Sequence, residues 1–77
     1  MKIIKIIIAL HTQYHPTLKE HISYFAGEDV MGRNTWTKNI NDAERFDNES
    51  EVKKFIRYNK QPKGRTLRPI YIDINEK

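Results

Sequence analysis

The most chemically distinctive stretch of this sequence runs from Val52 to Ile72 and holds seven Lys and Arg residues with no acidic residue. The rest of the chain holds the other seven basic residues and all ten acidic ones, although the net charge of the whole chain is only +4. Cations at this density bind phosphate groups or acidic surfaces. The seven residues are Lys53, Lys54, Arg57, Lys60, Lys63, Arg65 and Arg68.

Four of these cations lie in the segment KQPKGRTLR, which follows a predicted helix. Gly64 within this segment allows a backbone to approach a ligand closely. Cations on a helix face and its following loop are typical of proteins that track a phosphate backbone, and Tyr58, Trp36 or Tyr71 could stack on unpaired bases. Two other interpretations stay open: the lysines solvate an exposed helix, or they contact an acidic protein surface.

No other group of residues forms a recognisable catalytic or metal site. His11 and His15 flank a strand end and a proline turn, and neither they nor His21 are joined by a cysteine. Ser23 and Ser50 have no evident His and Asp partners, and the glycines match neither a Walker loop nor a dinucleotide fingerprint. The sequence therefore predicts a non-enzymatic protein with no metal and no cofactor.

The scaffold for the basic segment is organised around Lys2–Leu10, where five isoleucines fall in nine residues. Such β-branched residues favour a strand. The even-numbered residues from Ile4 to Leu10 form an apolar face that should meet a helix, whereas the odd-numbered face includes Lys5 and needs only partial cover. The run is too short to cross a bilayer and no small-residue cleavage site follows it, so we expect a soluble, cytoplasmic protein without membrane contact.

Three further strands are predicted, two of them joined by a hairpin loop over 27–32 that has glycine at both ends. Between residues 39 and 47, the three-residue spacing of Ile40, Ala43 and Phe46 indicates a single helical turn or a bent connection. A helical turn over Thr17 to His21 is a further expectation. The predicted strands are His21–Ala26, Asn34–Lys38 and Leu67–Ile74.

One principal helix is predicted to begin after Asn48, whose side chain can cap it with Glu51 as the reciprocal partner. Apolar residues at Val52, Phe55 and Ile56 form the stripe that should face the sheet. The helix should stop near Asn59, because a proline and a glycine follow. The pattern as a whole predicts one α+β domain over 1–77, with a mostly antiparallel sheet of about four strands and one helix packed on one face.

The stretch from Trp36 to Ile56 resembles a pattern in small accessory proteins of bacteriophages. In these proteins a strand ending in W-T-x-N leads to Ala-x-x-Phe, and then to an acid-started helix with Phe near its end. The resemblance implies an early phage protein that binds and disables a bacterial factor in restriction, CRISPR or toxin–antitoxin systems. The matching residues here are Trp36, Thr37, Asn39, Ala43, Phe46, Glu51, Val52 and Phe55.

Many phage inhibitors that mimic DNA are strongly acidic. The positive charge of this chain therefore favours binding to a nucleic acid over mimicry of one. We expect a small anti-defence protein that binds RNA, or a ribonucleoprotein or defence protein of the bacterial host, through the seven cations and Tyr58. A homodimer is compatible with this expectation. The alternative is an inhibitor or assembly factor that binds protein alone, through a sheet edge or the surface around Trp36.

Overall fold

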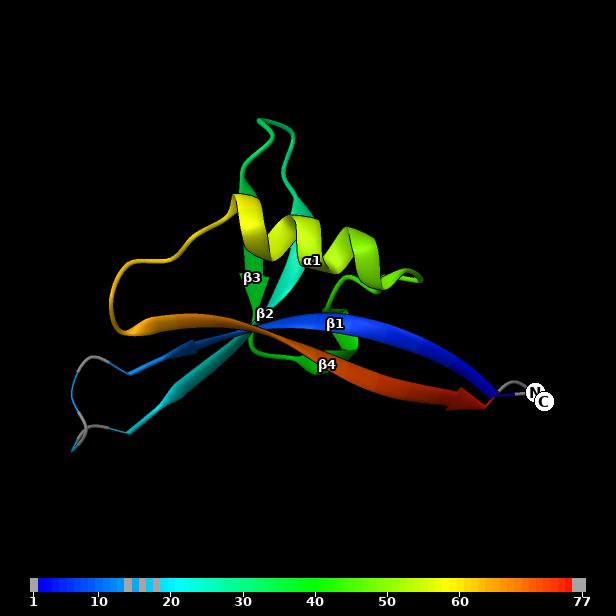
Figure 1. Cartoon of the computed structure of the whole chain (residues 1–77), viewed down its shortest axis with the longest axis horizontal. Helices are drawn as coiled ribbons and strands as arrows, with labels where there is room; N and C mark the ends of the chain where they lie inside the picture. The colour runs from blue at the N-terminus through cyan, green and yellow to red at the C-terminus, as the bar shows by residue number, and fades with distance from the viewer. Residues whose placement is uncertain (1, 14, 16, 18, 76–77) are drawn as a thin grey trace.

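The computed structural model describes residues 2–13, 15, 17 and 19–75 of the chain. In this part four strands form one antiparallel sheet in the order β3-β2-β1-β4, and α1 packs on one face of it (Figure 1). This arrangement confirms the predicted α+β class. The elements are β1 (Lys2–Thr12), β2 (His21–Glu28), β3 (Asn34–Thr37), the 3-10 turn η1 (Ile40–Asp42), α1 (Glu49–Tyr58) and β4 (Arg65–Asn75).

The two longest strands, β1 and β4, pair along their full length from Lys2 opposite Asn75 to Thr12 opposite Arg65. The ladder continues one step further, where the Gln13 N–H donates to the Gly64 carbonyl over 2.7 Å. Residues of an antiparallel strand direct their backbone groups alternately to one side and the other. Pro69, five residues after Gly64, therefore lies where its missing N–H would face the open edge of β4, the position that a sheet tolerates for proline.

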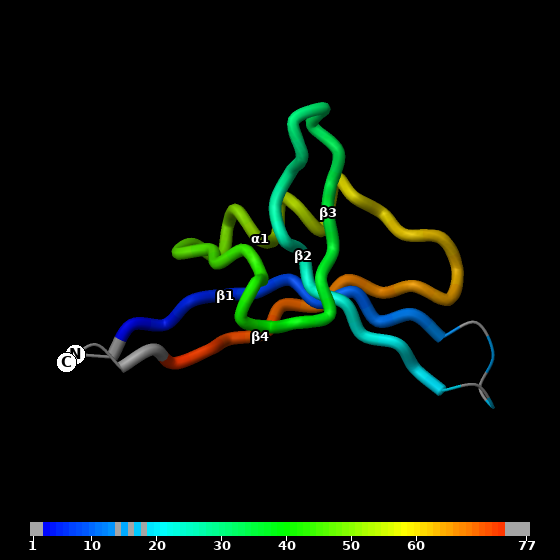
Figure 2. The backbone as a smooth tube through the Cα atoms, turned by 180° about the vertical axis from the view of Figure 1, so that it is seen from behind, coloured from blue at the N-terminus to red at the C-terminus, as the bar shows by residue number. Residues whose placement is uncertain are grey.

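The β2–β3 hairpin leaves the plane of the long strand pair (Figure 1). β2 pairs with β1 only from Thr12 opposite His21 to Ala9 opposite Tyr24. Beyond that point Phe46 pairs with β1 in place of β2. The Ile6 N–H donates to the Phe46 carbonyl over 2.9 Å, and the Phe46 N–H donates to the Ile6 carbonyl over 2.8 Å. The rest of β2 is consequently free to bend away with β3 and to project beside α1 (Figure 2).

The core lies between α1 and the sheet and is centred on Phe25, which is 5 % exposed. The Phe25 ring centroid lies 4.5 Å from that of Phe55, 5.7 Å from Trp36 in an edge-on arrangement, and 6.0 Å from Phe46. The helix contributes Val52 to this cluster, as its apolar stripe predicts. The remaining members are Ile6 and Ile8 of β1, with Ile56 and Leu67 packed against them.

The two faces of β1 are each buried over only part of the strand. Ile6 and Ile8 belong to the core cluster under α1, but Ile4 on the same face is 57 % exposed. On the other face, Ile7 and Ala9 are completely buried while Ile3 and Lys5 are half-buried, which agrees with the expected partial cover. Figure 2, which views the molecule from behind, shows the connection that contains η1 crossing in front of the long strands, and the buried Ala43 belongs to it.

Local signals account for both ends of α1. The Asn48 side chain accepts a hydrogen bond from the Ser50 N–H over 2.7 Å, which confirms the predicted cap. The reciprocal bond expected from Glu51 is not among those of the described residues; the Ser50 hydroxyl donates to Asn48 instead, over 2.6 Å. At the other end, Asn59 caps Phe55 through both its backbone and its side-chain amide.

The remaining expectations concern short connections. The helical turn after Asn39 is confirmed as η1, capped by the Asn39 side chain. The helical turn expected over Thr17 to His21 lies partly outside the described residues, and Lys19 and Glu20, which are described, are not helical. Across the described ranges, no helix is long and apolar enough to cross a membrane.

Candidate nucleic-acid interface

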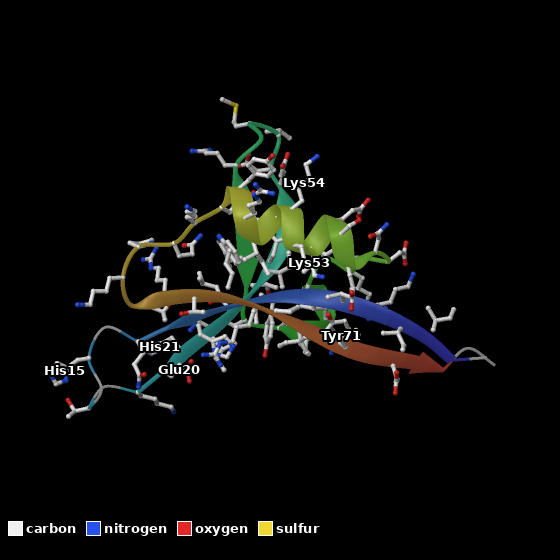
Figure 3. The ribbon with its side chains drawn as sticks, viewed as in Figure 1. His15, Glu20, His21, Lys53, Lys54 and Tyr71 are labelled. Carbon is white, nitrogen blue, oxygen red and sulfur yellow. The ribbon has the colours of Figure 1, made fainter. Side chains whose placement is uncertain are left out.

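The cations of α1 lie in two rows on its outer surface. Residues four apart on a helix share a face, so Lys53 and Arg57 form one row, and Lys54 and Tyr58 form another. All four side chains are exposed. The stripe through Val52 faces the sheet and lies between the two rows. The row of Lys53 and Arg57 is therefore on the β4 side of the helix, and the row of Lys54 and Tyr58 is on the hairpin side. Lys54 accordingly points in the direction of the projecting hairpin, and Lys53 toward the long strands (Figure 3).

The two rows enclose a shallow hollow of about 310 Å³ on the helix surface. Its lining combines three cations with one aromatic ring and one hydroxyl group. A phosphate with its attached base needs this combination, because the charges bind the phosphate and the ring can stack on the base. The lining residues are Ser50, Lys53, Lys54, Arg57 and Tyr58.

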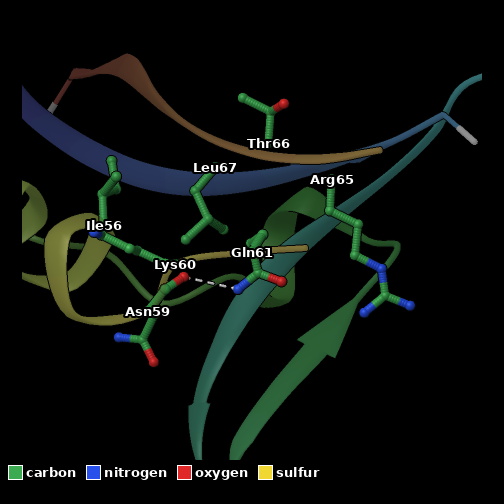
Figure 4. Close-up of a pocket in the computed structure, with 7 residues that line it drawn as sticks. All are labelled: Ile56, Asn59, Lys60, Gln61, Arg65, Thr66 and Leu67. Atoms are coloured by element: carbon green, nitrogen blue, oxygen red, sulfur yellow. Dashed lines mark hydrogen bonds between the residues drawn. The ribbon is translucent and has the colours of Figure 1, made fainter. Parts of the chain in front are cut away.

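A second hollow of about 320 Å³ lies between the C-terminal end of α1 and the start of β4 (Figure 4). Ile56 and Leu67 supply its apolar surface, while Lys60 and Arg65 supply positive charge. The Gln61 side-chain amide donates to the Asn59 carbonyl over 2.9 Å, so the connection after the helix is held in place. Asn59 and Thr66 complete the lining.

A tight turn connects this hollow to β4 and presents Lys63 at its corner. The Arg65 N–H donates to the Pro62 carbonyl over 3.1 Å and closes the turn. Gly64 has φ +93° there, a conformation that a side chain disfavours. The turn therefore explains Gly64, which the sequence had suggested as a point of close approach for a ligand. Lys60, Lys63 and Arg65 are exposed around it.

Arg68 does not join the other six cations. Leu67 packs into the core under α1, and Tyr71 also reaches α1, so the odd-numbered residues of this part of β4 face the helix. Successive residues of a strand point to opposite faces. Arg68 therefore lies on the face of the sheet away from α1. The structure thus separates Arg68 from the six cations with which the sequence grouped it, because the alternation within β4 turns its side chain to the other face.

The protein's own carboxylates leave most of this surface uncompensated. Three ion pairs lie away from this surface: Lys5 with Asp47, His11 with Glu20 and Arg33 with Asp29. Within the described ranges, none of the three cations on α1 is paired with a carboxylate, nor are Lys60 and Lys63. The surface is thus open to an external anion.

Three aromatic residues were candidates for stacking, and the structure separates them. The Tyr58 side chain is 72 % exposed beside the cations of α1. Trp36 is half-buried against Phe25, which makes it a core residue more than a surface platform. The Tyr71 hydroxyl donates to Glu49 Oε1 over 2.9 Å, and this bond raises the pKa of Tyr71, as do burial and the Glu49 charge. Tyr58 lines the same hollow as the cations, whereas Tyr71 is 54 % exposed but directs its hydroxyl to a carboxylate.

The histidines lie apart from this surface. His11 Nδ1 is 2.6 Å from Glu20 Oε1, and His15 Nδ1 is 2.7 Å from Thr17 Oγ1 (Figure 3 labels His15, Glu20 and His21). Among the described residues, no group of three or more His, Asp or Glu side chains is placed to hold a metal ion.

Sequence reasoning missed the tip of the β2–β3 hairpin. Val30 and Met31 are 102 % and 74 % exposed there, and Arg33 follows them. The signal was present in the sequence as two adjacent apolar residues inside a loop of glycines and acids. Such a loop is expected to be polar throughout.

Comparison of the chain with protein-family models, with curated proteins and with solved structures finds no match.

Proposed function

We propose that this protein binds RNA without catalysing a reaction, through α1 and the turn that follows it. The supporting observation is that α1 and the connection after it expose five cations with no carboxylate partner in the described structure: Lys53, Lys54, Arg57, Lys60 and Lys63. Unpaired cations of this kind gain most from binding a phosphate backbone, because each phosphate contact releases a condensed counterion.

The biological role that we propose is that of a phage accessory protein acting in the host cytoplasm. Its target would be a ribonucleoprotein or nuclease of a bacterial defence system, such as a CRISPR or toxin–antitoxin component. This part of the proposal depends on the resemblance of Trp36 to Ile56 to phage accessory proteins. The RNA-binding part depends on charge and exposure alone, and it can be tested separately.

The test is filter binding of a labelled RNA stem–loop at several salt concentrations. With six phosphate contacts divided between the stem and the loop, the logarithm of affinity should fall against the logarithm of salt with a slope of about −4 to −5. A triple variant with Lys60→Glu, Lys63→Glu and Arg65→Glu should lose retention of the RNA while keeping the circular dichroism spectrum of the parent protein. Retention by this variant at the parental level would contradict the proposal.

A matched control separates local charge from net charge. Lys19, Lys38 and Arg45 are exposed and lie outside the proposed interface. Replacing these three with Glu changes the net charge by the same amount, so RNA retention should change far less than in the interface variant. An equal loss in both variants would show that only long-range attraction operates.

The alternative is a partner that is protein alone. The open edge of β4 offers a surface for it, because an added strand could pair there on either side of Pro69. Such an interface depends on backbone hydrogen bonds and apolar contacts, so its affinity should vary little with salt. Weak salt dependence of binding to a purified partner would favour this alternative.

A further inference from the structure

The β2–β3 hairpin ends in a loop that its own side chains hold in one shape. The Asp29 carboxylate accepts hydrogen bonds from the backbone N–H groups of Met31 and Arg33 over 2.8 and 2.9 Å, and from Arg33 Nε over 3.2 Å. The Gly32 N–H donates to the Asp29 carbonyl over 3.0 Å, and Gly32 has φ +78°. A loop held in this way presents its tip without paying an ordering cost on binding.

What this ordered loop presents is apolar. Val30 and Met31 follow Asp29 directly and are the most exposed large apolar side chains of the described residues. Exposed apolar side chains at an ordered tip stabilise nothing in the protein itself, since they touch water in the folded and unfolded chain alike. The tip is therefore shaped for burial against something else.

The tip is flanked by charges of both signs, because Glu28 and Asp29 precede Val30 and the Asp29 carboxylate pairs with Arg33. The Arg33 side chain is 77 % exposed although it bonds to Asp29. The Lys54 and Tyr58 row lies on the hairpin side of α1, and the Asn34 side chain ties the base of the hairpin to Asn59 at the end of that helix. An apolar tip with the Lys54 and Tyr58 row of α1 beside it suits an occupant that is anionic outside and apolar inside, as stacked bases between phosphates are.

We propose that the hairpin tip is a wedge that enters the base stack of an RNA helix where the stack is interrupted by an unpaired nucleotide. Val30 and Met31 fill the gap and cover the exposed face of a base pair, while Arg33 and Lys54 neutralise the flanking phosphates and Tyr58 stacks on the displaced base. An interrupted helix is required, because the major groove of continuous A-form RNA is too narrow for side chains to read. This inference rests on the proposed RNA binding and names its substrate class.

The experiment compares two RNA stem–loops that differ only in one bulged nucleotide, which carries 2-aminopurine. The parent protein should bind the bulged RNA about tenfold more tightly than the fully paired one. It should also change the 2-aminopurine fluorescence, because the base exchanges its neighbours in the helix for the Tyr58 ring. The double variant Val30→Ser, Met31→Ser should lose both the preference and the fluorescence change, and should keep the affinity for the paired RNA.

Two controls make the result specific. Ile40→Ser removes an exposed apolar side chain of η1, away from the tip, and should leave the preference intact. Val30→Leu with Met31→Leu keeps apolar volume at the tip and should keep the preference as well. Asp29 is unchanged in all of these variants, so the loop keeps its shape.

The outcomes distinguish the wedge from RNA binding as such. Equal affinity for the two RNAs, or a Ser variant that weakens both equally, would overturn the wedge while the proposed function stands. No binding to either RNA would overturn both. A Ser variant with full preference and full fluorescence change would leave the tip free for a protein partner and would also overturn the wedge.

Discussion

The Asn34 side-chain amide donates a hydrogen bond to Asn59 Oδ1 over 3.0 Å and so joins the base of the β2–β3 hairpin to the end of α1. Asn59 in turn donates to the Phe55 carbonyl over 2.9 Å, which makes one residue both the cap of the helix and its link to the sheet. Both amides are half-buried. The angle of the hairpin to the basic helix depends on this contact.

Asn34→Ala should lower the free energy of unfolding by about 1–2 kcal/mol, because it leaves the Asn59 oxygen without its partner in a half-buried place. Asn59→Ala should cost more, since the cap of α1 is lost as well. Urea denaturation of both single variants and the double variant gives the coupling between the two side chains. Additive losses would mean that the contact contributes no energy of its own.

Arg68→Glu should weaken RNA binding much less than Lys60→Glu, although the sequence grouped the two residues. Lys60 lines the hollow beside α1, whereas Arg68 lies on the opposite face of β4. Losing one phosphate contact should also reduce the salt slope by about one for Lys60 only. Filter binding of the two single variants at matched salt makes the comparison. Equal losses would place the RNA along the edge of β4 and not over the helix.

The hairpin loop should loosen in acid. Hydrogen bonds from the Arg33 backbone, the Met31 backbone and the Arg33 side chain lower the pKa of Asp29, against the opposing effect of burial. A carboxyl group whose pKa is lowered by folding stabilises the fold above its unfolded pKa, and this contribution is lost as the pH falls through the folded pKa. The Met31 and Arg33 amide signals in nuclear magnetic resonance spectra should therefore shift together, and only at a pH below the ordinary pKa range of an aspartate carboxyl group. Asp29→Ala should abolish this transition.

Phe25→Ala should remove most or all of the stability of this fold. The ring contacts three other aromatic rings, and truncating a buried Phe costs about 3–5 kcal/mol. A domain of this size has little more than that in total. Thermal unfolding followed by circular dichroism should show no cooperative transition, while Phe25→Leu should retain one at a lower temperature. A cooperative transition near the parental temperature in Phe25→Ala would place the core elsewhere.

The elements of the fold could be predicted from local patterns, because each carries its own signal. Five isoleucines mark β1, Asn48 marks the start of α1, and the following proline and glycine mark its end. The bend of β2 away from β1 could not be predicted. It depends on Phe46 taking the place beside Ile6, which is a contact across forty residues with no local signature.

The candidate site shows the same division. Charge along the sequence identified the cations of α1 and the following turn, and periodicity explains why their side chains are exposed. The separation of Arg68 could not be predicted, because its face depends on which side of β4 meets the helix, and only Leu67 and Tyr71 in three dimensions decide that. The apolar hairpin tip could not be predicted, because the glycines and acids of the loop already indicate a turn and give no sign that Val30 and Met31 would be exposed.

Pro69 has a consequence for how copies of this protein coexist in solution. Pro69 lies near the middle of β4, whose outer edge is open. A strand of a neighbouring chain that paired there would need an N–H donor at this position, and proline has none. Runaway stacking of strands into fibres requires an uninterrupted row of donors and acceptors. The Pro69 ring nitrogen interrupts this row of donors at one position, so we expect Pro69 replacement to favour association of chains along β4 more than it changes the fold.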